Sequence, residues 1–155
     1  MSSPPPRPPY EIARLEDIPL TATDDHPVLR LAGEWRQVRR HFMIREFSAN
    51  AFTSTAPNQE IVHEHFEQPN DETSDVGDEE LYLVLGGSAT VKLNTESVRV
   101  EPGTFVFVGE PSVVRSITAH EPGTTVVSFG TNPGVRFVVS KFEEDVSPPA
   151  RWNES

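Results

Sequence analysis

Short runs rich in Val, Ile, Phe, Thr and Tyr recur from Trp35 onward, and clusters of Gly, Pro, Asn and Asp separate them. Runs of this length and composition are typical of β-strands bounded by turns. No helical period longer than about three turns interrupts them, which argues against an alternating βα architecture. We expect strands near residues 38–46, 49–55, 60–66, 80–86, 88–94, 97–101, 104–109, 112–118, 123–130 and 135–141. The pattern indicates an all-β fold, either a sandwich or a barrel.

Two glycine-containing turns support this interpretation. In "LYLVLGGSATVKL", a Gly-Gly pair separates two apolar runs, as expected where a turn needs positive φ. In "VRVEPGTFVFV", Pro102 fixes φ for a turn, and Gly103 takes the position that a larger residue resists. We expect each segment to form a β-hairpin.

The two ends of the chain differ in composition from this central part. Residues 1–9 are Pro-rich and are expected to form a disordered arm. Residues 10–142 are expected to form one domain with an N-terminal lead-in, and a length of 155 residues suits a single domain. Residues 143–155, which contain Pro148 and Pro149, are expected to be a flexible tail.

Charge and cysteine content exclude several classes of function. A net charge of -11, with only two lysines, disfavours nucleic acid and an acidic membrane surface as partners. The chain has no cysteine, so any metal would have to be held by His and carboxylate side chains. No apolar segment follows a basic start, and we therefore expect a cytoplasmic protein.

Three residues with metal-ligating side chains follow a strand-like spacing. His63 and His65 are two residues apart, so a strand would place both imidazoles on the same face. Glu80 begins the next strand and shares a face with Tyr82 and Val84. Two imidazoles and one carboxylate could hold Fe, Mn, Ni or Zn with open coordination positions, and Tyr82 is the candidate catalytic acid or base. Alternatively, the three ligands are solvated polar residues and Tyr82 belongs to the core.

The segments "HEH", "EELYLVLGG" and "VEPGTFVFVGEPSVVRSI", within about residues 60–118, resemble the two-part signature of the cupin superfamily. The arrangement of "WRQVRRH", "EELYLVLGG" and "EPGTTVVSFG" also resembles small single-domain bacterial cupins. The resemblance implies a cupin-type antiparallel β-barrel, also called a double-stranded β-helix or jelly roll. It also implies that His63, His65 and Glu80 are the metal ligands, since Glu80 precedes Gly87 by the seven positions of the family motif. A homodimer is expected as well.

The chain departs from the family pattern in two places. An acidic loop over residues 67–79 lengthens the usual short gap between the second His and the Glu. Val114 stands where the family supplies a fourth ligand, so Ser116 or His120 would have to replace it. Arg115 is expected to face outward, or alternatively to bind a carboxylate substrate.

These observations predict a metal-dependent enzyme that acts on a small organic substrate, of the dioxygenase, isomerase or lyase type. The alternative is a non-catalytic cupin that binds a small molecule and has a degenerate metal site. A third interpretation is a scaffold whose barrel only dimerises.

Overall fold

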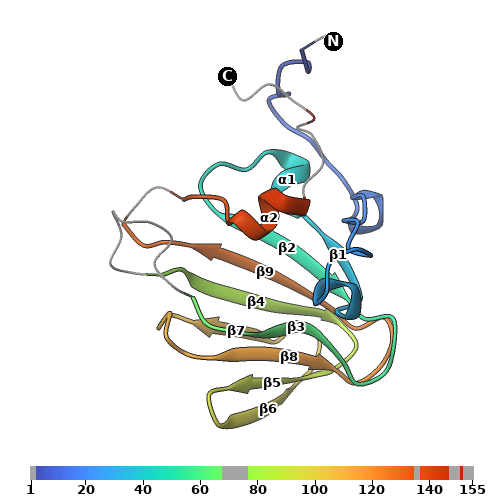
Figure 1. The fold of residues 1–155 in the computed structure, drawn as a ribbon, viewed down its shortest axis with the longest axis vertical. Coiled ribbons are helices and arrows are strands. Elements are labelled where there is room, and N and C mark those ends of the chain that lie inside the picture. The colour runs from blue at the N-terminus through green and yellow to red at the C-terminus, as the bar shows by residue number, and fades with distance from the viewer. Residues whose placement is uncertain (1–2, 68–76, 135–136, 147–150, 152–155) are drawn as a thin grey trace.

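Nine β-strands dominate the computed structural model, which describes residues 3–67, 77–134, 137–146 and 151 (Figure 1). The strands are β1 (Glu34–Arg36), β2 (Ser48–Thr53), β3 (Gln59–His65), β4 (Glu79–Gly86), β5 (Ala89–Leu93), β6 (Glu96–Val100), β7 (Phe105–Val108), β8 (Arg115–Ala119) and β9 (Thr125–Thr131). The helices are two 3-10 turns, η1 (Leu15–Asp17) and η2 (Leu29–Leu31), and two short α-helices, α1 (Val38–Phe42) and α2 (Lys141–Val146). None of the helices within the described ranges is long and apolar enough to cross a membrane.

The strands form two antiparallel sheets. One sheet has the order β1-β2-β9-β4-β7, and the other has the order β3-β8-β5-β6. Val84 and Val126 from the first sheet pack with Val91 and Ile117 from the second in a single apolar core. Each of these four side chains is almost fully buried because the inner faces of the two sheets lie against each other. The predicted all-β jelly roll is confirmed.

The two predicted hairpins are wrong, although the turns are real. β4 pairs with β7 and β9, whereas β5 pairs with β6 and β8, so Gly86 and Gly87 carry the chain from one sheet to the other. The Pro102–Gly103 turn likewise connects β6 to β7 in the opposite sheet. Turn chemistry predicts that the chain reverses, but it does not decide which strand becomes the neighbour. The tight hairpin in this region joins β5 to β6, with Asn94 in the left-handed conformation at φ 54°.

The strand predicted over residues 38–46 is also wrong, because α1 occupies its first half. The helix ends at Phe42, and the next residue, Met43, caps it in the left-handed conformation at φ 54°. It contains the buried Arg39, which pairs with Glu143 in α2. Of the strand predicted over 135–141, residues 135–136 lie outside the described ranges. Residues 137–140 are irregular, and α2 begins at Lys141.

The two ends relate to the predicted boundaries in different ways. Residues 3–9 contain neither helix nor strand. The tail predicted from residue 143 begins inside α2, and residues 147–150 and 152–155 lie outside the described ranges. Most of the acidic loop, residues 68–76, lies outside them as well. Figure 1 shows α1 and α2 on one side of the molecule, near β2.

Candidate functional site

A cavity of about 330 Å³ lies where β3 faces the five-stranded sheet. Its apolar wall consists of Leu29, Ala32, Trp35, Phe52, Ile61 and Val62. Its polar lining consists of Asn50, His63, His65, Glu80, Tyr82, Ser128, Ser140 and Glu143. A largely apolar cavity with a few converging polar groups is the usual form of a small-molecule site. A larger groove of about 690 Å³ runs outside the barrel between the N-terminal lead-in and the helices, but the clustered ionisable groups described below do not line it.

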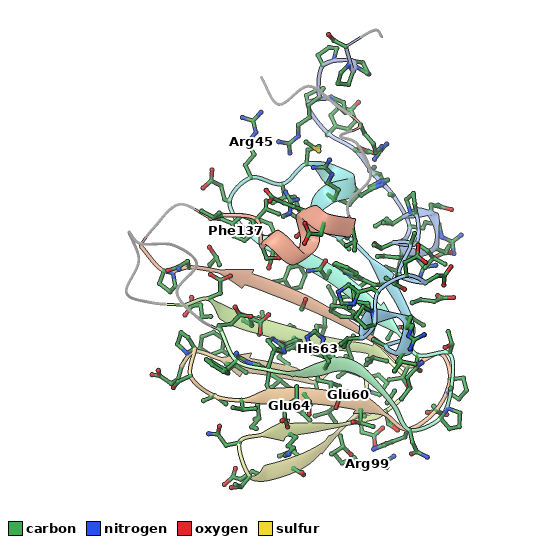
Figure 2. The ribbon with its side chains drawn as sticks, in the orientation of Figure 1. Arg45, Glu60, His63, Glu64, Arg99 and Phe137 are labelled. Atoms are coloured by element: carbon green, nitrogen blue, oxygen red, sulfur yellow. The ribbon has the colours of Figure 1, made fainter. Side chains whose placement is uncertain are left out.

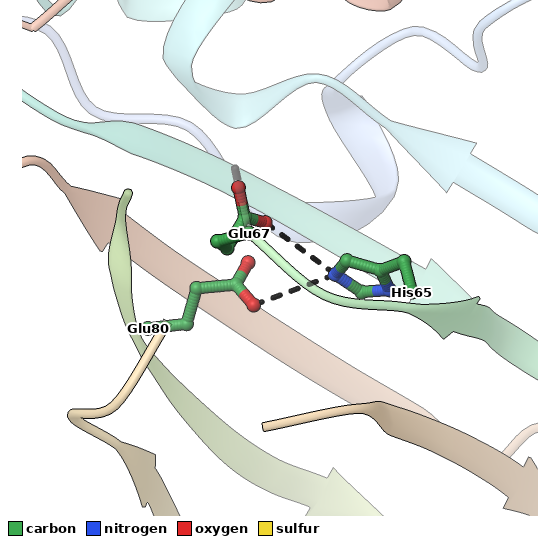
Figure 3. Close-up of side chains that lie close together, drawn as sticks. All are labelled: His65, Glu67 and Glu80. Atoms are coloured by element: carbon green, nitrogen blue, oxygen red, sulfur yellow. Dashed lines mark ion pairs between the residues drawn. The ribbon is translucent and has the colours of Figure 1, made fainter. Parts of the chain in front are cut away.

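His65, Glu67 and Glu80 converge at the polar end of the cavity (Figure 3). His65 Nε2 lies 3.5 Å from Glu67 Oε1 and 3.5 Å from Glu80 Oε2. His65 Nδ1 donates to the backbone carbonyl of His63 at 2.8 Å, which turns Nε2 toward the two carboxylates. The candidate ligand atoms of these three residues all lie within 4.8 Å of one another.

The ionisation of His65 and Glu80 follows from this convergence. Burial alone would lower the pKa of His65, but hydrogen bonds to Glu67 and Glu80 outweigh it and raise that pKa to about 10. Burial alone would raise the pKa of Glu80, but His65, Tyr82 and Arg115 together lower it. The cluster thus combines an imidazolium with charged carboxylates.

His63 lines the cavity but is not one of the three residues whose ligand atoms converge. Its ring centroid lies 5.5 Å from that of His65, and Figure 2 shows it on the side of β3 toward β4. Burial and the adjacent charge of His65 lower the pKa of His63, which favours its neutral form. Of the three predicted ligands, the structure therefore places His65 and Glu80 together and His63 beside them. Their role in binding metal stays a prediction.

Glu67 is the member of the cluster that sequence reasoning missed. Glu67 is the first residue of the acidic loop over residues 67–79, and it continues the two-residue alternation of His63 and His65 by one further step. Its backbone N–H donates to the carbonyl of Pro111 at 2.9 Å, which ties this end of the loop to the β7–β8 connection. The alternation was the signal that could have identified it.

Arg115 faces into the barrel, so the prediction that it faces outward is wrong. It pairs in register with His65, its side chain is only 1% exposed, and its Nε lies 3.5 Å from Glu80 Oε2. Its Nη1 donates to the carbonyl of Pro111 at 3.4 Å, whereas Nε and Nη2 have no hydrogen-bond partner among the described residues. A buried guanidinium requires a compensating anion, and Glu80 supplies it.

The residue from this segment that reaches Glu80 is therefore Arg115 rather than Val114. Val114 precedes β8, and its backbone N–H donates to Asn94 Oδ1 at 3.0 Å. His120 does not replace the missing ligand, because the hydroxyls of Ser88 and Thr90 contact its two ring nitrogens at 2.9 and 2.7 Å.

Tyr82 is buried beside the cluster, and its hydroxyl donates to Glu80 Oε2 at 2.5 Å. Burial, reinforced by the charge of Glu80, raises the pKa of Tyr82 well above its usual range. The hydroxyl therefore stays protonated and orients the carboxylate of Glu80.

The donor set formed by His65, Glu67 and Glu80 fits a divalent metal. One imidazole nitrogen and two carboxylates suit Fe, Mn, Ni or Zn and leave coordination positions free. The charges set a condition on binding, since His65 and Arg115 already balance the two carboxylates. An ion can use Nε2 of His65 only after its proton leaves.

No protein-family model and no curated protein matches the chain. Among solved structures, a sugar phosphate isomerase of the cupin superfamily from Silicibacter pomeroyi is similar at 12% identity and a TM-score of 0.61, over 78% of this chain and 75% of that one. An RmlC-like cupin from Shewanella frigidimarina is similar at 12% identity and a TM-score of 0.54, over 81% and 94%. A protein from Acidithiobacillus ferrooxidans, described as a proposed sugar phosphate isomerase, has 17% identity and a TM-score of 0.52 over 63% of this chain. This chain covers 58% of that protein, which is less than two thirds of its length.

Proposed function

We propose that this chain, which has the cupin double-stranded β-helix fold predicted from its sequence, is a metal-dependent enzyme that acts on a small organic substrate. The convergence of His65, Glu67 and Glu80 beside a partly open cavity, which His65 and Glu80 line, is the observation that carries this proposal. A divalent ion held there would act as a Lewis acid toward a substrate oxygen. The structures described as isomerases that share the fold favour an isomerase-type reaction over oxygenation.

The residues of the chain divide the remaining tasks. Glu80 receives the hydroxyl hydrogen bond of Tyr82, which fixes the carboxylate relative to the cavity. Tyr82 is therefore proposed as a catalytic group that orients Glu80 and whose hydroxyl oxygen can accept a hydrogen bond from a substrate hydroxyl. Trp35 and Phe52, whose rings stack with centroids 6.4 Å apart, form an apolar wall that excludes water.

The charge of the cavity wall restricts the substrate. Among the described residues, no Lys or Arg lines the cavity, whereas Glu80 and Glu143 do. A phosphate group usually requires arginine, lysine or a helix N-terminus. We therefore propose a small uncharged substrate with an apolar part and an oxygen-bearing end, rather than a sugar phosphate.

Metal binding by the purified protein tests the proposal. We expect one Mn²⁺ or Zn²⁺ per chain by elemental analysis after reconstitution and dialysis, and loss of that metal in His65→Ala and Glu80→Gln. The matched control is Glu64→Gln, which changes a solvent-exposed carboxylate on the same strand and should retain the metal. No stoichiometric metal in the wild-type protein would refute the metal-dependent function.

A second candidate function is a metal-free cupin that binds a small molecule. The observation that favours it is Arg115, whose buried charge beside Glu80 already balances the carboxylates. In this case a thermal-shift screen in the presence of a chelator would still find stabilising ligands. Stabilisation only after metal addition would exclude this alternative.

A further inference from the structure

The outer face of the five-stranded sheet, which faces away from the cavity, carries two apolar rows. In the first row, Leu81 lies opposite Phe107 on one side and Phe129 on the other. In the second row, Leu83 lies between Phe105 and Val127. Paired residues of an antiparallel sheet share a face, so each row is continuous across β7, β4 and β9.

These rows remain exposed in the single chain. Phe105 and Phe107 are each 63% exposed and Phe129 is 36% exposed, and Leu85 adds a further exposed side chain on the same face of β4. The alternating residues Tyr82 and Val84 point the other way, into the core. Strands with one wet face normally alternate apolar and polar residues, whereas strands covered on both faces are continuously apolar. "LYLVL" in β4 and "FVFV" in β7 follow the second pattern, so this face is built to be covered.

We propose that a second copy of this chain covers the outer face, so that two five-stranded sheets pack back to back around a two-fold axis. A two-fold contact brings the same patch on both copies together, and aromatic rows suit such self-complementary packing. This arrangement gives the homodimer expected from the sequence a defined interface, and it holds whether or not the cavity binds metal.

The absence of charged residues from the two rows is compatible with a second copy as the occupant. The chain has a net charge of -11, so two copies repel each other except where they meet through uncharged surface. The two rows contain only Phe, Leu and Val. The same net charge disfavours an anionic membrane as the occupant.

The exposed apolar area of this face is also of the order that a specific protein interface needs. At about 200 Å² for a phenylalanine side chain, Phe105, Phe107 and Phe129 together expose about 300 Å² per chain. A specific interface buries about 800 Å² per partner, with an apolar centre and a polar rim. The three rings would supply more than a third of it, and the leucines between them would add to the centre.

Sedimentation equilibrium over a concentration range tests the proposal. We expect the wild-type chain of 17.2 kDa to sediment at twice that mass, and Phe105→Lys/Phe107→Lys to sediment as a monomer. The control Val98→Lys adds charge at an exposed valine on β6, the edge of the other sheet, and should remain dimeric. Circular dichroism establishes that each variant is folded.

A cross-linking measurement covers the case in which the double lysine variant unfolds. The chain contains no cysteine, so Phe105→Cys introduces a single thiol at the proposed interface. We expect oxidation to link Phe105→Cys into a disulfide dimer much faster than Val98→Cys. A wild-type monomer at high concentration, a dimer unaffected by the lysines, equal cross-linking of both cysteine variants, or binding of a wild-type monomer to phosphatidylcholine vesicles would each overturn the proposal.

Discussion

Arg115 Nε lies 3.5 Å from Glu80 Oε2, and this contact joins the two sheets at the polar end of the cavity. Glu80 Oε2 also accepts a hydrogen bond from the hydroxyl of Tyr82 and lies opposite His65 Nε2. One carboxylate oxygen thus meets two cationic groups and one neutral donor, so its charge is compensated without an added ion.

Replacement of Arg115 by Met should destabilise the metal-free protein and strengthen metal binding. Removing one partner of a buried ion pair leaves the other uncompensated and costs about 3 kcal/mol or more. A divalent ion would then supply the missing positive charge. The measurement is the urea midpoint of wild type and variant, with chelator and with Mn²⁺.

The control for this prediction is Arg99→Met. The Arg99–Glu101 pair is largely exposed, and exposed pairs contribute little to stability. A variant of Arg115 that loses no stability, or that gains none from Mn²⁺, would contradict the prediction.

Metal affinity should rise with pH. The pKa of His65 is raised to about 10, so near neutral pH its imidazole carries a proton that an ion must displace. Below that pKa, the fraction of deprotonated His65 rises about tenfold for each unit of pH. The apparent Kd for the metal should therefore fall about tenfold per unit. Competition titrations with a chromophoric chelator at pH 6, 7 and 8 measure this slope.

The pH slope should be absent from the residual binding of His65→Ala. An affinity of the wild-type protein that does not change between pH 6 and 8 would show that His65 is not a ligand. In that case His65, Glu67 and Glu80 would be a group of ion-paired side chains and not a metal site in which His65 is a ligand.

Truncation of Glu143 should destabilise the C-terminal helix. Arg39 Nε donates to Glu143 Oε1 at 2.7 Å, and both side chains are buried although they are 104 residues apart in sequence. Glu143→Ala leaves a buried guanidinium unpaired, and we expect a loss of about 3 kcal/mol in the free energy of unfolding. Glu144→Ala changes the exposed neighbour on the same helix and should have little effect. Equal losses in the two variants would argue against the ion pair as the cause.

Gly87→Ala should be more destabilising than Gly103→Ala. Both glycines have positive φ, at 70° and 86°, so alanine is strained at either position. At Gly87 the new Cβ would also lie 2.3 Å from Thr124 Oγ1, whereas at Gly103 nothing lies within 4 Å. We expect losses of about 1–3 kcal/mol, larger at Gly87, by thermal unfolding. The reverse order would show that the close approach of Thr124 does not determine the loss at Gly87.

Local sequence patterns predicted most strands because alternation and turn residues act over a few positions. They did not predict sheet membership, since the same glycine turn can return the chain to its neighbour or carry it to the opposite sheet. Val38 to Phe42 form a helix instead of a strand, and Arg39 in this helix pairs with Glu143, a partner far away in sequence that a local pattern does not reveal.

Local alternation also predicted where two residues of the candidate site lie. The two-residue spacing placed His65 on the inner face, and the start of β4 placed Glu80 there. Arg115 was misplaced because a charged residue is expected at the surface unless its buried partner is known. That partner, Glu80, lies in the other sheet.

The ionisable groups and the aromatic wall of the cavity come from different strands. His63, His65 and Glu80 belong to β3 and β4, whereas Trp35 and Phe52 belong to β1 and β2. A molecule held against the aromatic rings would therefore present a single prochiral face to His65 and Glu80. An enzyme that reacts through these two residues would act on that face alone and release one enantiomer.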